Sequence, residues 1–225
     1  MVGPVTAIDE GAALCAPFLR RLPADGLSIV VVSGAGAQST VGTTDTVAAR
    51  LDQLQFELGE GPTPDVLLLG QPVLTPDLRA ADVRNGWPLF GAAAVAVGAD
   101  GMFSFPMLVG VLTVGVVSMY SGTVQQPWTA AALQTAAGLT AAAVIPALEL
   151  AARSAAQHER DPRARTAELR REVHQASGML TVQLDCSIEE ALSLLRAYAF
   201  AHARPIDAVA RDIVGRTLDL GAEDE

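Results

Sequence analysis

Residues 169–180 have the sequence LRREVHQASGML, which has the periodicity of an amphipathic helix. The apolar residues recur at i, i+4, i+7 and i+11 and form one narrow seam, as a helix–helix contact needs: Leu169, Val173, Ala176 and Leu180. The adjoining stripe holds side chains that can all donate hydrogen bonds: Arg170, His174, Ser177 and Thr181. The stretch alone leaves two interpretations open, a packing helix whose polar side faces water and a helix whose polar side binds a partner.

Gly178 lies inside this expected helix. A glycine in a helix interior costs about 1 kcal/mol relative to alanine, so its presence calls for a reason. Together with Ala176 it would let another backbone approach closely.

The residues that follow predict two more helices. Ser187 and Glu190 have the spacing of a capping box at the start of one helix, and Pro205 suits the first turn of the next. Residues 168–213 as a whole resemble the ANTAR domain, the three-helix RNA-binding module of bacterial transcription antiterminators. The matching positions keep the order and spacing of the family: Arg170, Val173, Ala176, Gly178, Leu180, Glu190, Ala191, Leu195, Ala199, Val209 and Ala210. The chain departs from the family at Ser177, where Lys is usual, and at Thr181, where Met is frequent.

The resemblance implies that this module binds paired hairpins in a nascent transcript and so disfavours a terminator. We expect the RNA-contact surface to comprise Arg170, Arg171, His174 and Ser177, with Arg204 near the start of the last helix. The first four are expected on the side of the helix away from the apolar seam, where a hairpin loop can approach. Arginine offers bidentate contacts to phosphates and bases, and histidine can stack or donate.

The N-terminal 150 residues predict an α+β domain. The expected helices are residues 7–22, 45–57, 63–71 and 129–148, the last with a kink near Pro146. The expected strands are residues 27–33 and 92–97 and a pair within 103–120 that turns near Gly110. Residues 76–88 are expected to form a loop. The hairpin at Gly110 favours an antiparallel sheet with flanking helices.

Three segments of this region resemble the GAF domain, a small-molecule sensor fold, over about residues 5–150. They are LGEGP at 58–62, Pro88 to Phe90, and FPMLVGV at 105–111. GAF joined to ANTAR is a recurring pairing in actinobacterial regulators. In close relatives a cysteine often follows LGEGP, whereas Thr63 and Pro64 stand there in this chain, so thiol redox sensing is not available at that turn. The ligand-binding residues are unknown; we expect any pocket within residues 25–120 to be largely apolar, the alternative being a filled core.

Charge is distributed unevenly along the chain, whose net charge is −10. All 15 basic residues are arginine, which we attribute to codon usage in a GC-rich genome. Residues 1–150 hold 5 arginines against 12 acids, and residues 151–220 hold 10 against 10. Such a chain does not bind nucleic acid by bulk charge, so a local patch must do so. One candidate patch is Arg153, Arg160, Arg163, Arg165, Arg170 and Arg171, although on charge alone a solvated linker fits equally well.

The sequence shows no recognisable set of catalytic or metal-binding residues. Cys15 and Cys186 are far apart, which fits a reducing cytosol. The three histidines have no metal-binding spacing, and no GxSxG or paired-carboxylate motif stands out. Residues 34–39 begin like GxGxxG but lack the third glycine, so a hairpin turn fits better. We therefore expect no enzyme activity, no metal and no cofactor.

Two uncharged stretches need to be weighed as membrane spans. Residues 101–120 contain Pro106, Gly110 and Gly115 and fit two strands. Residues 129–148 are mostly Ala and Thr, which insert poorly. The N-terminus has no basic residue before Arg20 and so does not resemble a signal peptide. We expect a cytoplasmic protein without membrane contact that forms a homodimer through the helices from Trp128 to Leu180.

The expected layout has four parts. Residues 1–150 form a GAF-like sensor domain, 151–166 an arginine-containing linker or helix extension, 167–220 an ANTAR-like RNA-binding domain and 221–225 an acidic tail. The expected function is RNA-binding transcription antitermination controlled by an unknown small-molecule ligand or upstream signal. The alternative is a protein-interaction regulator whose helices dimerise or dock a partner; the acidic total charge, Ser177 and Thr181 favour it, whereas Arg170 and Arg171 favour RNA.

Overall fold

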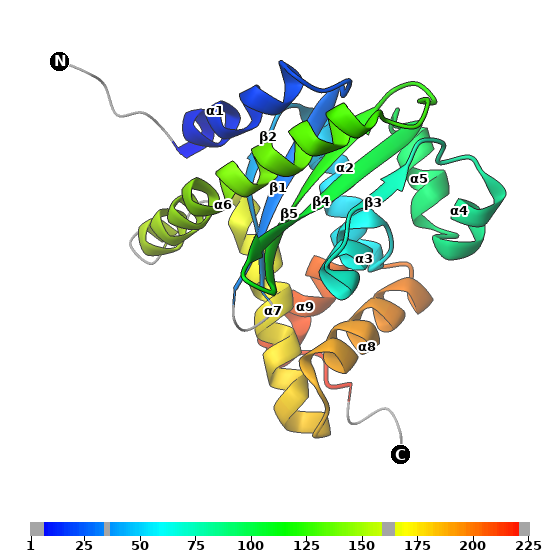
Figure 1. Ribbon diagram of the computed structural model, residues 1–225. Coiled ribbons are helices and arrows are strands. Elements are labelled where there is room, and N and C mark those ends of the chain that lie inside the picture. Colours follow the sequence, from blue (N-terminus) through cyan, green and yellow to red (C-terminus); the bar gives the residue numbers. More distant parts are fainter. Residues whose placement is uncertain (1–6, 34–36, 159–164, 221–225) are drawn as a thin grey trace. The chain divides into compact units, whose positions relative to one another are not determined.

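The computed structural model describes residues 7–33, 37–158 and 165–220, which divide into two compact units (Figure 1). The helices of the first unit are α1 (Ala7–Leu19), α2 (Thr46–Leu58), α3 (Pro62–Leu69), α4 (Ala81–Gly86), α5 (Phe90–Ala96) and α6 (Ala130–His158). Its strands are β1 (Gly26–Val32), β2 (Gln38–Thr43), β3 (Val73–Thr75), β4 (Gly101–Val109) and β5 (Leu112–Ser121). The second unit carries α7 (Arg165–Leu184), α8 (Ile188–Ala201) and α9 (Ile206–Val214).

The strands of the first unit form one sheet in the order β2-β1-β5-β4-β3. β5 pairs antiparallel with both β1 and β4, and β3 pairs antiparallel with β4. The β4–β5 hairpin turns at Gly110, whose φ of 62° lies in the left-handed region that glycine adopts without strain. The antiparallel sheet and the turn at Gly110 confirm the expected α+β class.

Helices cover both faces of this sheet (Figure 1). α1 and α6 lie on one face, over an apolar core that includes Ile29, Phe103 and Met119. Trp128, just before α6, stacks on Phe103 with 4.2 Å between ring centroids. On the other face α2, α3 and α5 cover a second core around Leu51 and Phe90. Because both faces are covered, strand β1 is buried at consecutive positions instead of alternating with solvent.

Several local expectations for the first unit are wrong. Residues 92–96 are not a strand but part of α5, and Val97 is the C-cap of that helix. The Ala-rich run FGAAAVA has high helix propensity, and a short apolar run does not by itself distinguish strand from helix. The expected loop 76–88 contains α4, and β3 precedes it. α6 continues through Pro146 to His158, so the expected linker begins as helix. The expectation for residues 34–39 differs from these: strand β2 begins at Gln38, within that segment, where a nucleotide-binding loop would need a helix, and residues 34–36 lie outside the described residues.

The second unit is a three-helix bundle in which α7 packs against both α8 and α9. Val173, Ala176 and Leu180 of α7 are buried, as the expected seam requires. Facing them, α9 buries residues at i, i+3, i+4 and i+7: Ile206, Val209, Ala210 and Ile213. α8 starts with the expected capping box, in which Ser187 accepts from the Glu190 N–H and the Glu190 carboxylate accepts from the Ser187 N–H. The seam is therefore satisfied within one chain and does not need a second copy.

Among the described residues, α6 alone has the length and apolar composition of a membrane-crossing helix, over Ala130–Ala156. Ala136, Ala143 and Ala147 of α6 are buried in the core that the sheet and α1 share. Core helices of this kind pass the same length and hydropathy test, so the composition of α6 is weak grounds for a span.

Candidate nucleic-acid interface

The polar stripe of α7 that was expected to contact RNA lies largely inside the second unit. The side chain of Arg170 is 7% exposed and that of Ser177 is fully buried. The Ser177 hydroxyl donates a hydrogen bond to the carbonyl of Val173, 2.7 Å away, within the same helix. The expected placement of Arg170 and Ser177 on the open side of the helix is therefore wrong. The reason is that α7 has two neighbouring helices, which together cover a wider arc than a single seam.

His174 occupies the edge of this buried arc and is half-buried. Burial, together with the nearby positive charges of Arg170 and Arg196, lowers the pKa of His174 to about 4. At neutral pH the imidazole is uncharged, so His174 does not add a positive charge for phosphates.

The other expected arginines are placed as follows. Arg171 belongs to α7, but its side chain lies outside the described residues. Arg204 is half-buried and forms an ion pair with Asp212 of α9, its Nη2 donating to Oδ2. Of the arginine-rich segment 153–171, Arg160 and Arg163 lie outside the described residues, and Arg153 pairs with Glu10 and Glu149.

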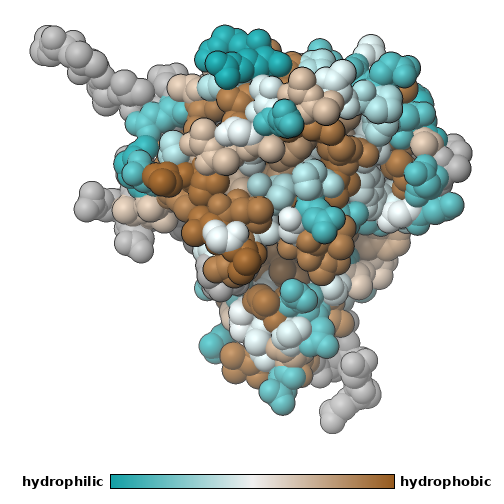
Figure 2. Space-filling model, in the orientation of Figure 1, coloured by the Kyte–Doolittle hydropathy of each residue, from teal (hydrophilic) through white to brown (hydrophobic). Residues whose placement is uncertain are grey.

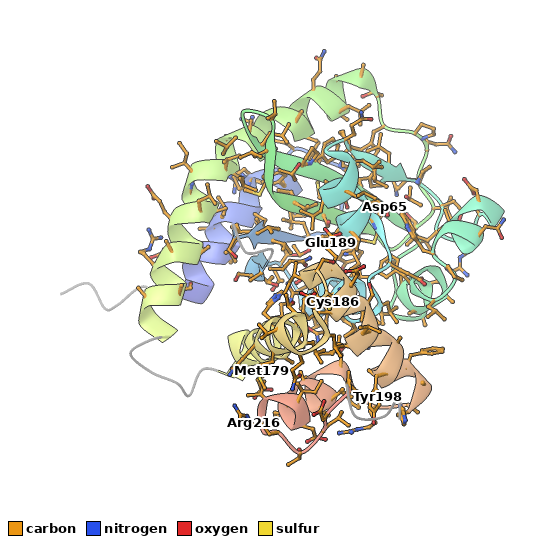
Figure 3. The ribbon with its side chains drawn as sticks, turned by 90° about the horizontal axis from the view of Figure 1, so that it is seen from below. Asp65, Met179, Cys186, Glu189, Tyr198 and Arg216 are labelled. Carbon is orange, nitrogen blue, oxygen red and sulfur yellow. The ribbon has the colours of Figure 1, made fainter. Side chains whose placement is uncertain are left out.

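The solvent-exposed side of α7 carries residues that were not expected to contact RNA. Gln175, Gly178 and Val182 follow one another at i, i+3 and i+7 and are all exposed. Beside them a hollow of about 710 Å³ opens between α7 and the chain that follows α9. Met179 lies on the α7 side of this hollow and Arg216 on the other, as Figure 3 labels them. The signal was in the sequence: these positions lie opposite the Val173 and Leu180 seam.

The turn after α9 fixes the far wall of this hollow. The N–H of Arg216 donates to the carbonyl of Ile213, and the N–H groups of Thr217 and Leu218 donate to that of Asp212. Arg216 adopts a φ of 56°, in the left-handed region that non-glycine residues seldom occupy. Within the described residues Arg216 forms no ion pair, in contrast to Arg204 and to Arg211, which pairs with Glu172 and Asp207.

A second hollow, of about 790 Å³, lies at the start of α8. Its lining includes Cys186, Glu189 and Glu190 (Figure 3 labels the first two). The backbone and hydroxyl groups of Ser187 lower the pKa of Glu190, so this carboxyl is ionised at neutral pH. Two adjacent carboxylates repel phosphate groups and make this hollow a poor surface for RNA.

The first unit holds a buried polar row where its sheet meets α2 and α3. Ser28, Ser118 and Ser104 stand directly opposite one another on β1, β5 and β4. The hydroxyl of Ser118 lies 2.8 Å from that of Ser104 and 2.9 Å from that of Thr63 at the start of α3. All four residues are buried. This hydroxyl row was not expected from the sequence, because its members come from four separate elements.

Gln55 of α2 extends this row. Its Oε1 accepts a hydrogen bond from the N–H of Thr63, 2.7 Å away. The side chain is 1% exposed, and within the described residues its Nε2 has no hydrogen-bond partner. Buried donors are nearly always paired, so this amide marks a position where a polar atom of a water or ligand would be stabilised. The two hollows described above both lie on the second unit, so neither of them is the apolar pocket expected within residues 25–120.

The described residues contain no cluster of three or more His, Cys, Asp or Glu able to hold a metal ion. Burial raises the pKa of the Cys15 thiol to about 12, so this cysteine is not a thiolate nucleophile at neutral pH.

Comparisons with known proteins agree with the division into two units. Residues 163–214 match the family model of the ANTAR domain, which covers all three helices of the second unit. A comparison with curated proteins found no match to this chain.

Solved structures of the first unit's kind are similar in fold but distant in sequence. One is the domain of a putative two-component sensor histidine kinase from Sinorhizobium meliloti: 15% identity, TM-score 0.50, covering 68% of this chain and 99% of that one. Two others are the GAF domains of phosphoenolpyruvate-protein phosphotransferases. The Acinetobacter domain has 13% identity, TM-score 0.50 and coverage of 68% and 88%. The Coxiella burnetii domain has 14% identity, TM-score 0.50 and coverage of 68% and 89%.

These findings define a chain of two units, of which the first is similar in fold to GAF domains and the second is a three-helix bundle. The chain thus joins a unit with a GAF-like fold to a C-terminal unit that matches the ANTAR domain.

Proposed function

We propose that this protein binds hairpins in nascent transcripts through its ANTAR domain and prevents terminator formation, under control of a signal received by the GAF-fold domain. The observation that carries the proposal is the match of residues 163–214 to the ANTAR family over a complete three-helix bundle. In this proposal the protein is located in the cytoplasm, forms a homodimer and catalyses no reaction.

The signal-sensing part of the proposal is supported by the GAF fold and by Gln55. The buried Nε2 of Gln55, which has no hydrogen-bond partner among the described residues, lies beside a row of hydroxyls and is suited to a small ligand with hydrogen-bonding groups of its own. The ligand itself is not specified by these residues.

A second candidate function, protein interaction without RNA, is supported by the charges of the second unit. Arg204 and Arg211 are both engaged by carboxylates, and Arg170 is buried. With a net charge of −10, the chain also lacks long-range attraction for RNA.

A gel-shift titration separates these two candidates. The RNA-binding proposal predicts a saturable shift of a two-hairpin RNA that weakens as salt rises, because counterions released from the phosphates drive binding. A wild-type protein that shifts no hairpin RNA even at low salt would favour the protein-interaction candidate.

A further inference from the structure

The hollow between α7 and the chain after α9 is lined by apolar, amide and charged side chains. Gly178 lies along it, and an added Cβ there would meet no atom within 4 Å. Close packing within the chain therefore does not account for this glycine, although glycine weakens a helix interior relative to alanine. What the glycine provides is open space on the α7 side of the hollow.

The walls of the hollow combine apolar and amide groups. Val182, 84% exposed, and Leu218 offer apolar surface on the two sides. Gln175 and Gln183 place amide groups along the same stretch of α7. A primary amide both donates and accepts hydrogen bonds, which is how glutamine recognises the edge of a base.

One cation and one carboxylate complete the lining. Arg216 is exposed and, among the described residues, forms no ion pair, so its guanidinium is free to meet a phosphate. Asp219 also lines the hollow and has interactions of its own within the protein. A sugar–phosphate backbone would consequently pass on the Arg216 side.

We propose that this hollow receives one unpaired base from the loop of an RNA hairpin, with the adjoining phosphate on Arg216. The inference rests on the proposed RNA-binding function and names the surface that performs it, in place of the buried stripe of Arg170 and Ser177. An unpaired base fits because sequence-specific RNA recognition targets splayed loop bases that stack on side chains and present their edges. The hollow at the start of α8 is excluded by the charges of Glu189 and Glu190.

The test uses the full chain and a pool of hairpin RNAs with one common stem and randomised loops. Wild-type protein is expected to enrich a subset of loops. Gly178→Leu, which places a bulky side chain into the hollow, is expected to weaken binding of an enriched hairpin by about tenfold or more, the scale of losing one stacked base. Gln175→Ala with Gln183→Ala is expected to lower affinity and relax the loop preference. Arg216→Ala is expected to reduce the slope of log affinity against log salt by about 0.7, one phosphate contact.

Matched controls separate the hollow from general effects. Ala197→Leu introduces the same side chain on the exposed side of α8, and Arg211→Ala removes an arginine that carboxylates already engage; both should bind as wild type does. Circular dichroism should show unchanged helix content in Gly178→Leu, since its side chain enters open space. A 2-aminopurine at the bound loop position should change fluorescence on adding wild-type protein and not on adding Gly178→Leu.

Three results would overturn the inference. If wild type binds enriched hairpins and Gly178→Leu binds them equally well, the base lies elsewhere while the RNA-binding function stands. If affinity depends only on the stem and not on the loop, an unpaired base is not what is recognised. If wild type binds no RNA from the pool at low salt, the inference and the proposed function fall together.

Discussion

Ser177 shows how a single position on a helix depends on the number of neighbours that the helix has. It lies one turn after Val173 on the side of α7 that α8 and α9 enclose, and its hydroxyl bonds to the helix's own backbone. Sequence periodicity identified the centre of the buried arc, at Val173, Ala176 and Leu180, but not its width. The width depends on how two other helices pack, which the residues of α7 do not specify.

Arg170 is expected to contribute to folding. Its side chain is buried, so Arg170→Ala removes packing around the aliphatic stem and leaves a cavity. The expected cost is about 1–3 kcal/mol of unfolding free energy. Urea unfolding followed by circular dichroism measures it, with the exposed Arg216→Ala as the control. Equal stability of the two variants would show that Arg170 is not buried in solution.

His174 is expected to make the second unit less stable in mild acid. Its pKa is about 4 in the folded protein against 6.5 for an unperturbed histidine, so between these values the unfolded chain holds more protons. Stability from the neutral imidazole is present above pH 6.5 and is lost as the pH falls towards 4. The stability of wild type relative to His174→Gln should therefore decrease over that window. The exposed His202→Gln is the control, and a difference independent of pH would contradict the assignment.

At the scale of elements, boundaries marked by capping residues were predictable and short apolar runs were not. Ser187 and Glu190 predicted the start of α8 correctly, because the two residues of a capping box have a fixed spacing and their side chains form hydrogen bonds with nearby backbone groups. Residues 92–97 were mistaken for a strand because alanine and valine fit either a short buried strand or a helix. The outcome depends on packing beyond the run itself, here on the burial of Phe90 and Ala94 in the core that also holds Leu51. The row of hydroxyl groups was not predicted, because Ser28, Ser104 and Ser118 become neighbours only through the register of three paired strands.

Ser187→Ala is expected to destabilise the second unit by about 0.5–2 kcal/mol, because the N–H of Glu190 loses its acceptor. Trp87 and Trp128 are the only tryptophans and both belong to the first unit. Helix loss followed by circular dichroism should therefore shift to lower urea, whereas tryptophan emission should not. Ser193→Ala, in the exposed middle of α8, serves as the control. A shift of both probes together would show that the two units unfold as one.

At the scale of the whole molecule, the exposed side of α6 is the strongest reason to expect a second copy. Its exposed residues include Ala137, Gly138, Ala141 and Ala142, and Ile145 is 68% exposed. Figure 2 shows apolar residues gathered on the face of the first unit over which α6 runs. Apolar surface of this kind usually marks an interface. The apolar seam of α7, by contrast, already packs against α8 and α9 of the same chain. We therefore expect the dimer interface to be formed by α6 alone and not by the whole span from Trp128 to Leu180.

Light scattering at micromolar concentration is expected to give twice the mass of one chain. Ala141→Arg with Ile145→Arg should yield monomers, because two charges would be buried in an apolar contact. Ala197→Arg on α8 should leave the mass unchanged. A wild-type monomer at this concentration would rule out the α6 interface.

Transcription through a terminator tests the central claim, antitermination by the ANTAR domain, most directly. A hairpin selected from the randomised pool is placed so that its stem competes with the terminator, and purified protein is added during single-round transcription. Read-through is expected to rise with protein concentration, and high salt is expected to abolish the effect. Read-through that stays constant while the protein occupies the hairpin would contradict it.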